Sequence, residues 1–304
     1  MPNESTAFLS ASEAAGESSR KVIVAYFSLT LTVVGTLLNS LTFLILCRST
    51  FTTIRPRPTL HYMRTMAVFD TLMLYGWNLD HYMEGIHNFL IQTSIMPLCR
   101  FFTFYNYITC QSSAWLRVFV CLDRYLALSR LHRTWLGNAN HVLFIIACIV
   151  GFFTLFNSLL FFCACTYGSD GAIIAGSWTL GTTFIWDYVH LGVYNCVPFI
   201  LMVILNSGVI YHLIQLRRAT TVNNSRIQHR TISITLVITT FLFLIMTVPS
   251  SVAFAFFSSA DANVLQFTDS LLYTYHILSF PLYLLTFDEF RREFIGMITC
   301  SHNM

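Results

Sequence analysis

Two pairs of charged residues lie inside or at the end of apolar stretches of the sequence. Asp70 and Arg117 each stand within such a stretch, and Asp123 and Arg124 are adjacent at the end of the stretch that holds Arg117. Burying a charge in hydrocarbon is costly, so each of these residues is a functional candidate. We predict that Arg117 pairs with Asp70 and supplies its cation. The alternative is that Arg117 extends toward an interface or a water-filled inner cavity.

The other reactive residues do not form a catalytic or metal-binding pattern. The nine cysteines are scattered and include no pair of Cys-x-x-Cys motifs, so we expect no metal site. Lys21, the only lysine, precedes the first apolar stretch, which excludes a retinal Schiff base. No nucleophile stands in a recognisable pairing with a base, so we expect neither an enzyme nor a cofactor.

The composition is that of a membrane protein. Of the 304 residues, 55% are apolar and only 10% are charged, whereas soluble domains carry about 25% charged residues. A net charge of +3 is too small to indicate a nucleic-acid partner. The chain is therefore expected to contact membrane lipid and no nucleic acid.

Seven apolar stretches follow the polar N-terminal segment, and each is long enough to cross a bilayer as a helix. They lie at about 22–47, 59–82, 97–123, 141–163, 191–216, 231–258 and 268–286. The predicted fold is an all-α membrane protein, a bundle of seven transmembrane helices.

Arginines set the expected orientation of this bundle. They gather in the links after the first, third, fifth and seventh stretches, which places those links inside and the N-terminus outside. We expect residues 1–21 to form an extracellular tail, 22–286 the bundle, and 287–304 a cytoplasmic amphipathic helix and short tail. Asn3 is then a glycosylation candidate and Cys300 a palmitoylation candidate.

The triplet Asp123-Arg124-Tyr125 resembles the Asp-Arg-Tyr motif of rhodopsin-like (class A) G-protein-coupled receptors. Further positions agree with that family in order along residues 22–294, namely Asn39, Asp70, Cys99, Pro198, Pro249 and Pro281. The closest likeness is to invertebrate neuropeptide receptors of the FMRFamide and myosuppressin type.

The resemblance implies roles for several of these residues. Asp123 and Arg124 would form an ion pair in the resting state, and Arg124 would later contact a heterotrimeric G protein together with Leu131. Asp70 would have a sodium-linked role with Ser113 as its neighbour. The remaining coupling or switch residues are Tyr125, Pro249 and Pro281, and Asn39 joins Asp70, Ser113 and Arg117 in a buried polar core.

The resemblance also implies a disulfide from Cys99 to Cys163 or Cys165, and Cys165 is favoured because it lies further from the helix. The following loop is long enough for a hairpin, with a turn signal at Gly168–Gly171 and with Trp178 and Trp186 as apolar contacts.

Two family positions differ here. The sixth helix has Thr247 in place of the usual tryptophan, and the seventh has Phe280 in place of the usual asparagine. These departures concern switch residues and not the fold.

The candidate ligand pocket is aromatic and polar. It comprises Trp77, Asp80, Glu84, Phe104, Asn106, Tyr107, Gln111, Tyr273 and His276. Asn106 stands where amine receptors carry an aspartate, so an amine ligand is not expected. Asp80 and Glu84 are four residues apart on one helix face, where they could accept a cationic group such as the arginine of an Arg-Phe-amide peptide. The alternative for this pair is a solvated helix end.

The predicted function is a multi-pass receptor of the plasma membrane that binds an extracellular ligand, most consistent with a neuropeptide, and activates a G protein. Two alternatives remain. A receptor for a small chemosensory ligand would share the fold. A seven-helix transporter would need an internal repeat or a second buried acid, and the sequence indicates neither.

Overall fold

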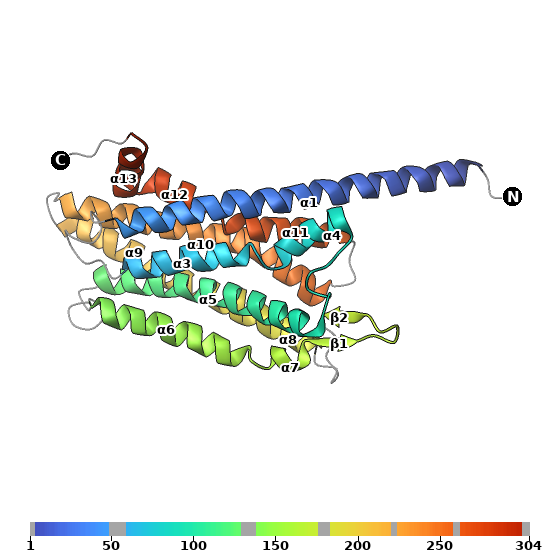
Figure 1. Ribbon diagram of the computed structural model, residues 1–304. Helices are drawn as coiled ribbons and strands as arrows, with labels where there is room; N and C mark the ends of the chain where they lie inside the picture. Colours follow the sequence, from blue (N-terminus) through green and yellow to red (C-terminus); the bar gives the residue numbers. More distant parts are fainter. Residues whose placement is uncertain are drawn as a thin grey trace.

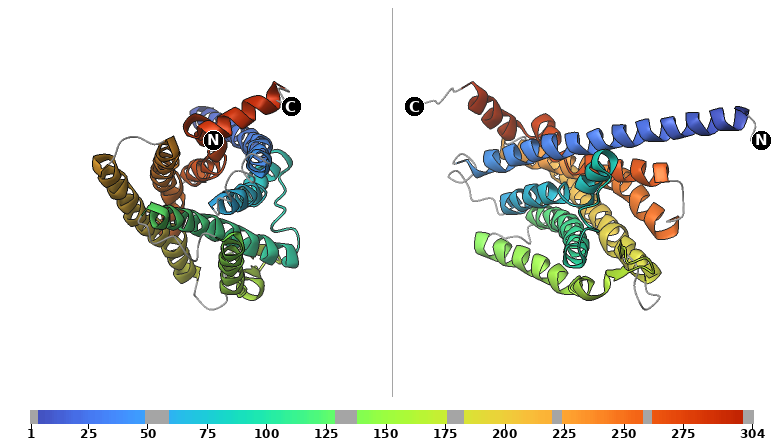
Figure 2. Two further views of the ribbon diagram at one scale, coloured as in Figure 1. Left: turned by 90° about the vertical axis from the view of Figure 1, so that its left-hand side faces the viewer. Right: turned by 45° about the vertical axis from the view of Figure 1, so that its right-hand side comes forward.

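The computed structural model describes residues 4–48, 59–128, 138–175, 183–219, 224–257 and 262–299. These residues form an elongated helical bundle with one short β-hairpin (Figures 1 and 2). Asn3, Leu131, Trp178 and Cys300 lie outside the described residues. The predicted all-α class is confirmed.

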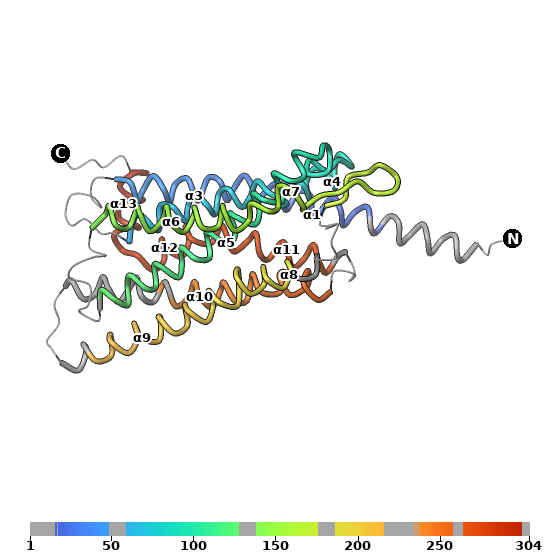
Figure 3. The backbone as a smooth tube through the Cα atoms, turned by 90° about the horizontal axis from the view of Figure 1, so that it is seen from below, coloured from blue at the N-terminus to red at the C-terminus, as the bar shows by residue number. Residues whose placement is uncertain are grey.

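The helices follow the predicted apolar stretches with shifted ends. The first five are α1 (Glu4–Cys47), α3 (Thr59–Met73), α4 (Trp77–His87), α5 (Met96–Leu128) and α6 (Ala139–Phe156). Next come α7 (Leu160–Cys163), α8 (Thr183–His190), the π-helix η2 (Leu191–Cys196) and α9 (Val197–Ala219). The last are α10 (Asn224–Phe256), α11 (Ala262–Tyr275), α12 (Ser279–Thr286) and α13 (Asp288–Ile298). In Figure 3, α9 and α10 lie side by side.

Four segments of the described chain are long and apolar enough to cross a membrane. They are Ser18–Cys47, Ala139–Cys163, Trp186–Gln215 and Val237–Phe256. Large apolar side chains are exposed on them, for example Phe162 at 73% and Leu155 at 75%. A surface of this kind suits hydrocarbon, so the protein is a helical membrane protein.

The other three predicted stretches are interrupted or more polar. The stretch 59–82 breaks between α3 and α4, and 268–286 breaks between α11 and α12. Helix α5 is continuous but contains both Asp123 and two buried arginines, Arg117 and Arg124. Helix α1 also differs from the prediction, because it begins at Glu4, well before residue 22.

The break at Gly76 has a specific cause on the neighbouring helix α5. The side-chain oxygen of Asn106 accepts a hydrogen bond from the Trp77 backbone N–H at 3.2 Å. A Cβ atom on Gly76 would lie only 1.8 Å from the same oxygen. The Asn106 side chain of α5 therefore caps the start of α4. Glycine at position 76 leaves room for this side chain because it has no Cβ atom.

Two of the predicted helix prolines follow irregular backbone. Pro198 is the second residue of α9, just after the π-helix η2, and Pro281 follows the turn His276–Leu278. Pro249 instead lies inside the unbroken helix α10. Proline removes a backbone hydrogen bond, so helices tolerate it where the neighbouring backbone rearranges.

The predicted hairpin and turn are present at one end of the bundle. Strand β1 (Cys165–Tyr167) pairs antiparallel with β2 (Ile173–Ala175). Gly171 has φ +81°, and the Gly168 N–H bonds the Ala172 carbonyl at 2.7 Å, which closes the turn. Cys165 rather than Cys163 forms the disulfide with Cys99. Trp186 lies in helix α8 and not in the loop, because that helix begins at Thr183 instead of 191.

We predict that Gly76→Ala lowers the free energy of unfolding by about 1–3 kcal/mol, because the methyl group must displace the Asn106 amide. The measurement is the thermal unfolding midpoint in detergent. The matched control is Gly151→Ala in α6, where a Cβ meets nothing within 4 Å. That control should be neutral or stabilising. Equal losses of unfolding free energy in Gly76→Ala and Gly151→Ala would contradict the steric explanation. It would also be contradicted if the losses in Gly76→Ala and Asn106→Ala simply added in the double variant.

Candidate functional site

The predicted ion pair between Asp70 and Arg117 is present in the middle of the bundle. Nη2 of Arg117 lies 2.7 Å and 2.8 Å from the two carboxylate oxygens of Asp70. The Asp70 side chain is fully buried, and that of Arg117 is 8% exposed. The guanidinium also lies over the ring of Tyr275, 4.8 Å from the ring centroid, which adds a cation–π contact. Arg117 therefore does not extend toward solvent.

Three further side chains donate hydrogen bonds to Asp70. The Ser113 hydroxyl lies 2.8 Å from Oδ1 and also accepts from Arg117. His276 Nδ1 is 2.8 Å from Oδ1, and because a carboxylate only accepts, this nitrogen must carry the proton. The Ser279 hydroxyl lies 3.3 Å from Oδ2. The predicted neighbour Ser113 thus contacts Asp70, whereas His276 belongs to this core and not to a ligand pocket.

This polar core connects four helices. Asp70 is in α3, Arg117 and Ser113 are in α5, and Ser279 begins α12. Asn39 of α1 donates to the His276 backbone carbonyl at 3.0 Å, within the turn that separates α11 from α12. A charged carboxylate surrounded by donors is stable in a low dielectric only while those donors stay in place. The core therefore fixes the relative positions of these helices.

A second ion pair occupies the end of α5 away from the hairpin. Arg124 Nε lies 3.9 Å from Asp123 Oδ2, as the resemblance implies. The hydroxyl of Thr59 donates to Asp123 and accepts from Arg124. All three residues are buried. Tyr125 faces α9, where its ring lies 5.7 Å from that of His212. We call Asp123, Arg124 and Thr59 the motif cluster.

A cavity of about 350 Å³ lies at the opposite end of the bundle, beside β2. Most of the predicted pocket residues line it, namely Trp77, Asp80, Glu84, Asn106, Tyr107 and Tyr273. Helices α3, α4, α5, α8, α10 and α11 all contribute to its walls. Its volume is at the lower end of the range for ligand sites, about 300–1,000 Å³.

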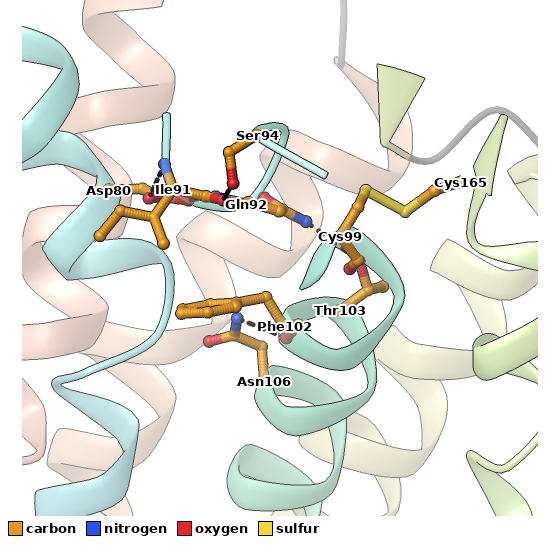
Figure 4. The surroundings of a disulfide bond; sticks show 9 residues. All are labelled: Asp80, Ile91, Gln92, Ser94, Cys99, Phe102, Thr103, Asn106 and Cys165. Atoms are coloured by element: carbon orange, nitrogen blue, oxygen red, sulfur yellow. Dashed lines mark hydrogen bonds between the residues drawn. A yellow bond between two sulfur atoms is a disulfide. The ribbon is translucent and has the colours of Figure 1, made fainter. Parts of the chain in front are cut away.

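Asp80 and Glu84 both line the cavity, as predicted, but Asp80 also has a structural role. Its two oxygens accept hydrogen bonds from the backbone N–H groups of Ile91 at 2.9 Å and Gln92 at 3.2 Å (Figure 4). Asp80 is 4% exposed, whereas Glu84 is exposed at the cavity rim. Asp80 therefore holds the loop that leads to Cys99.

Two other predicted pocket residues lie away from the cavity. Phe104 packs against Phe161 of α7, with ring centroids 4.3 Å apart. Gln111 is fully buried, where it accepts from Asn157 at 2.7 Å and contacts His190 at 3.3 Å. Helical spacing placed both residues at about the correct level along the axis of α5. It did not show which face of α5 points to the cavity.

Sequence reasoning missed two acids of the cavity, Asp187 and Asp269. Asp269 of α11 is 6% exposed and lies 3.3 Å from His81 Nε2. Asp187 of α8 accepts from the Tyr107 hydroxyl at 3.4 Å. The expectation of no second buried acid is therefore wrong. The available signal was the position of Asp269 just inside an apolar stretch.

Thr247, at the position where the resemblance would place a tryptophan, joins η2 to α10. Its hydroxyl contacts Asn195 Oδ1 at 2.8 Å and the Phe243 carbonyl at 2.6 Å. Asn195 in turn donates to the Ser251 hydroxyl at 2.5 Å. Ser251 also belongs to α10 and lines the cavity, so this hydrogen-bonded group joins η2 to the part of α10 that contains Pro249 and forms the cavity wall.

No protein-family model matches the chain, and a search of curated proteins finds no relative. The function must therefore be inferred from the residues and their geometry.

We predict that Arg117→Leu lowers the free energy of unfolding by about 3–5 kcal/mol, because it leaves Asp70 charged and buried without its partner. In the double variant with Asp70→Asn, the loss should fall short of the sum of the single losses by about 2 kcal/mol. The measurement is thermal unfolding of the four proteins in lipid nanodiscs.

The control for this cycle replaces a different arginine of the bundle. Arg64 donates to the Leu46 carbonyl at the end of α1 and is not among the described side chains that bond Asp70. Arg64→Leu should therefore add to Asp70→Asn within about 0.5 kcal/mol. Additivity in the Arg117 cycle as well would contradict a coupled pair.

Proposed function

We propose that the protein is a seven-transmembrane, G-protein-coupled receptor of the plasma membrane that binds an extracellular ligand, most consistent with a neuropeptide. The ligand would enter the cavity at the hairpin end. Binding would favour a conformation whose motif end recruits a heterotrimeric G protein. The cavity and the motif cluster are distinct sites, as such a coupling requires.

Seven crossings follow if each interrupted stretch spans the bilayer as a unit. The units are α1, α3 with α4, α5, α6 with α7, α8 through α9, α10, and α11 with α12. Breaks within membrane helices are tolerated where other helices bond the freed backbone groups. At the start of α4, Asn106 accepts a hydrogen bond from the backbone N–H of Trp77. At the break before α12, Asn39 donates to the backbone carbonyl of His276.

The observation that carries the proposal is the position of two sites on one helix. Asn106 lines the cavity, and Arg124 belongs to the motif cluster, 18 residues further along α5. At 1.5 Å per residue, these positions are about 27 Å apart, close to the thickness of the hydrocarbon core. The Asp70–Arg117 pair joins α5 to α3 between them. Helix α5 thus connects a ligand-sized cavity to a buried arginine.

The size of the cavity also favours a second candidate, a receptor for a small ligand. A volume of about 350 Å³ holds a small molecule or the end of a peptide, but not a whole peptide. The buried acids Asp80 and Asp269 line this same cavity at one end of the bundle, so they do not mark out a transport path.

We predict that Arg124→Ala abolishes ligand-dependent G-protein dissociation in cells, because it removes the buried guanidinium of the motif cluster. The measurement is a G-protein dissociation panel with a pool of amidated neuropeptides and a pool of small polar ligands. The control is Arg20→Ala, an exposed arginine in the N-terminal half of α1. Undiminished signalling by Arg124→Ala, at equal surface expression, would contradict the proposal.

A second prediction concerns Thr59, which bridges Asp123 and Arg124. Thr59→Val keeps the side-chain shape and removes the hydroxyl, so the motif cluster should hold Arg124 less firmly. We expect several-fold higher ligand-independent G-protein activation. Thr30→Val in α1 is the control, since that hydroxyl donates to the Tyr26 carbonyl of its own helix. Basal activity unchanged from wild type would show that Thr59 does not restrain Arg124.

A further inference from the structure

The charge of the cavity indicates the chemistry of its ligand. Four carboxylates line it, from Asp80, Glu84, Asp187 and Asp269, and the described lining includes no lysine or arginine. Aromatic rings of Trp77, Tyr107 and Tyr273 contribute further walls. Acids and aromatic faces in a partly desolvated site favour a positive group on the ligand.

Asp269 is the carboxylate best placed to exchange partners. The backbone N–H groups that bond Asp80 are fixed in a loop, whereas both partners of Asp269 are side chains. The Ser250 hydroxyl donates to Oδ1 at 2.6 Å, and His81 Nε2 contacts Oδ2 at 3.3 Å. Imidazole is a weak base that a guanidinium or ammonium group can replace at a carboxylate.

A second and independent feature of the cavity points to a ligand. Tyr194 lines the cavity and is 1% exposed, and its hydroxyl has no hydrogen-bond partner in the described structure. A buried hydroxyl without a partner costs free energy, which a polar ligand group would recover. The Tyr194 ring also contacts Phe243, whose ring contacts Tyr275 beneath Arg117. Tyr194 therefore lies between the cavity and the polar core.

We propose that the cavity binds a ligand with one guanidinium or ammonium group, which pairs with Asp269 in place of His81, and with a hydrogen-bonding group that reaches the Tyr194 hydroxyl. This inference deepens the proposed function and rests on it for any signalling consequence. It assigns the cation to Asp269 of α11, and not to the pair Asp80 and Glu84. Since His81 belongs to α4, the exchange of partners would loosen a direct contact between α4 and α11.

The test measures binding directly, with purified full-length protein in lipid nanodiscs and no G protein. The probes are N-acetyl-Arg-Phe-amide and N-acetyl-citrulline-Phe-amide, which have nearly the same size but differ in charge. We expect the arginine probe to bind about 30-fold more tightly to wild type, because only this probe supplies a partner for the buried carboxylate. Asp269→Asn should reduce that ratio to about one.

Two further variants separate the proposed contacts from general damage to the fold. His81→Leu removes the competitor for Asp269, so it should tighten binding of the arginine probe several-fold. This gain does not depend on whether Asp269→Asn folds. Tyr194→Phe should weaken both probes alike and leave their ratio unchanged, because the hydroxyl is uncharged.

Several results would overturn the inference. They are equal binding of both probes to wild type, binding of neither, or a charge preference that survives Asp269→Asn and disappears in Asp187→Asn. Failure of the proposed function looks different. In that case the arginine probe binds with the expected preference, yet no G protein responds to any ligand pool in cells.

Discussion

The buried ion pair between Asp70 and Arg117 is the interaction on which the rest of the bundle depends. Burying two charges is costly unless hydrogen bonds hold both of them in place. Here Asp70 accepts hydrogen bonds from Arg117, Ser113, His276 and Ser279. These donors come from α5, from the turn after α11 and from α12. A shift of any of those segments breaks a hydrogen bond in a low dielectric, so their positions are coupled.

Irregular backbone places the functional residues around this pair. The gap at Gly76 lets Asn106 reach the start of α4, and the turn at His276 presents its imidazole to Asp70. The π-helix turns Asn195 toward Thr247 of α10. Breaks of this kind cost backbone hydrogen bonds, and at Gly76 and His276 an asparagine side chain from another helix bonds a freed backbone group. Through them the cavity wall, the polar core and the motif cluster belong to one connected structure.

The sequence predicted the helical class, the Asp70–Arg117 pair and the hairpin turn, because apolar length, isolated charges and turn residues are local signals. The disulfide of Cys99 came from the family resemblance, which left Cys163 and Cys165 as candidate partners and favoured Cys165. The sequence did not predict the break at Gly76, whose cause is an asparagine 30 positions away. Likewise, periodicity placed Gln111 at the right depth but not on the right face. The cluster residue Thr59 carries no signal in a single sequence, since its role depends on tertiary contacts with α5.

Arg117 acts as a permanent internal cation for Asp70, and the dependence of thermal stability on sodium tests this role most directly. Unfolding midpoints would be compared in sodium chloride and in choline chloride at equal ionic strength. We expect no difference for the wild-type protein, because its carboxylate already has a cation, and a clear stabilisation by sodium in Arg117→Leu, where the site is vacated. A sodium-dependent midpoint in wild type, or indifference to sodium in both proteins, would contradict the account.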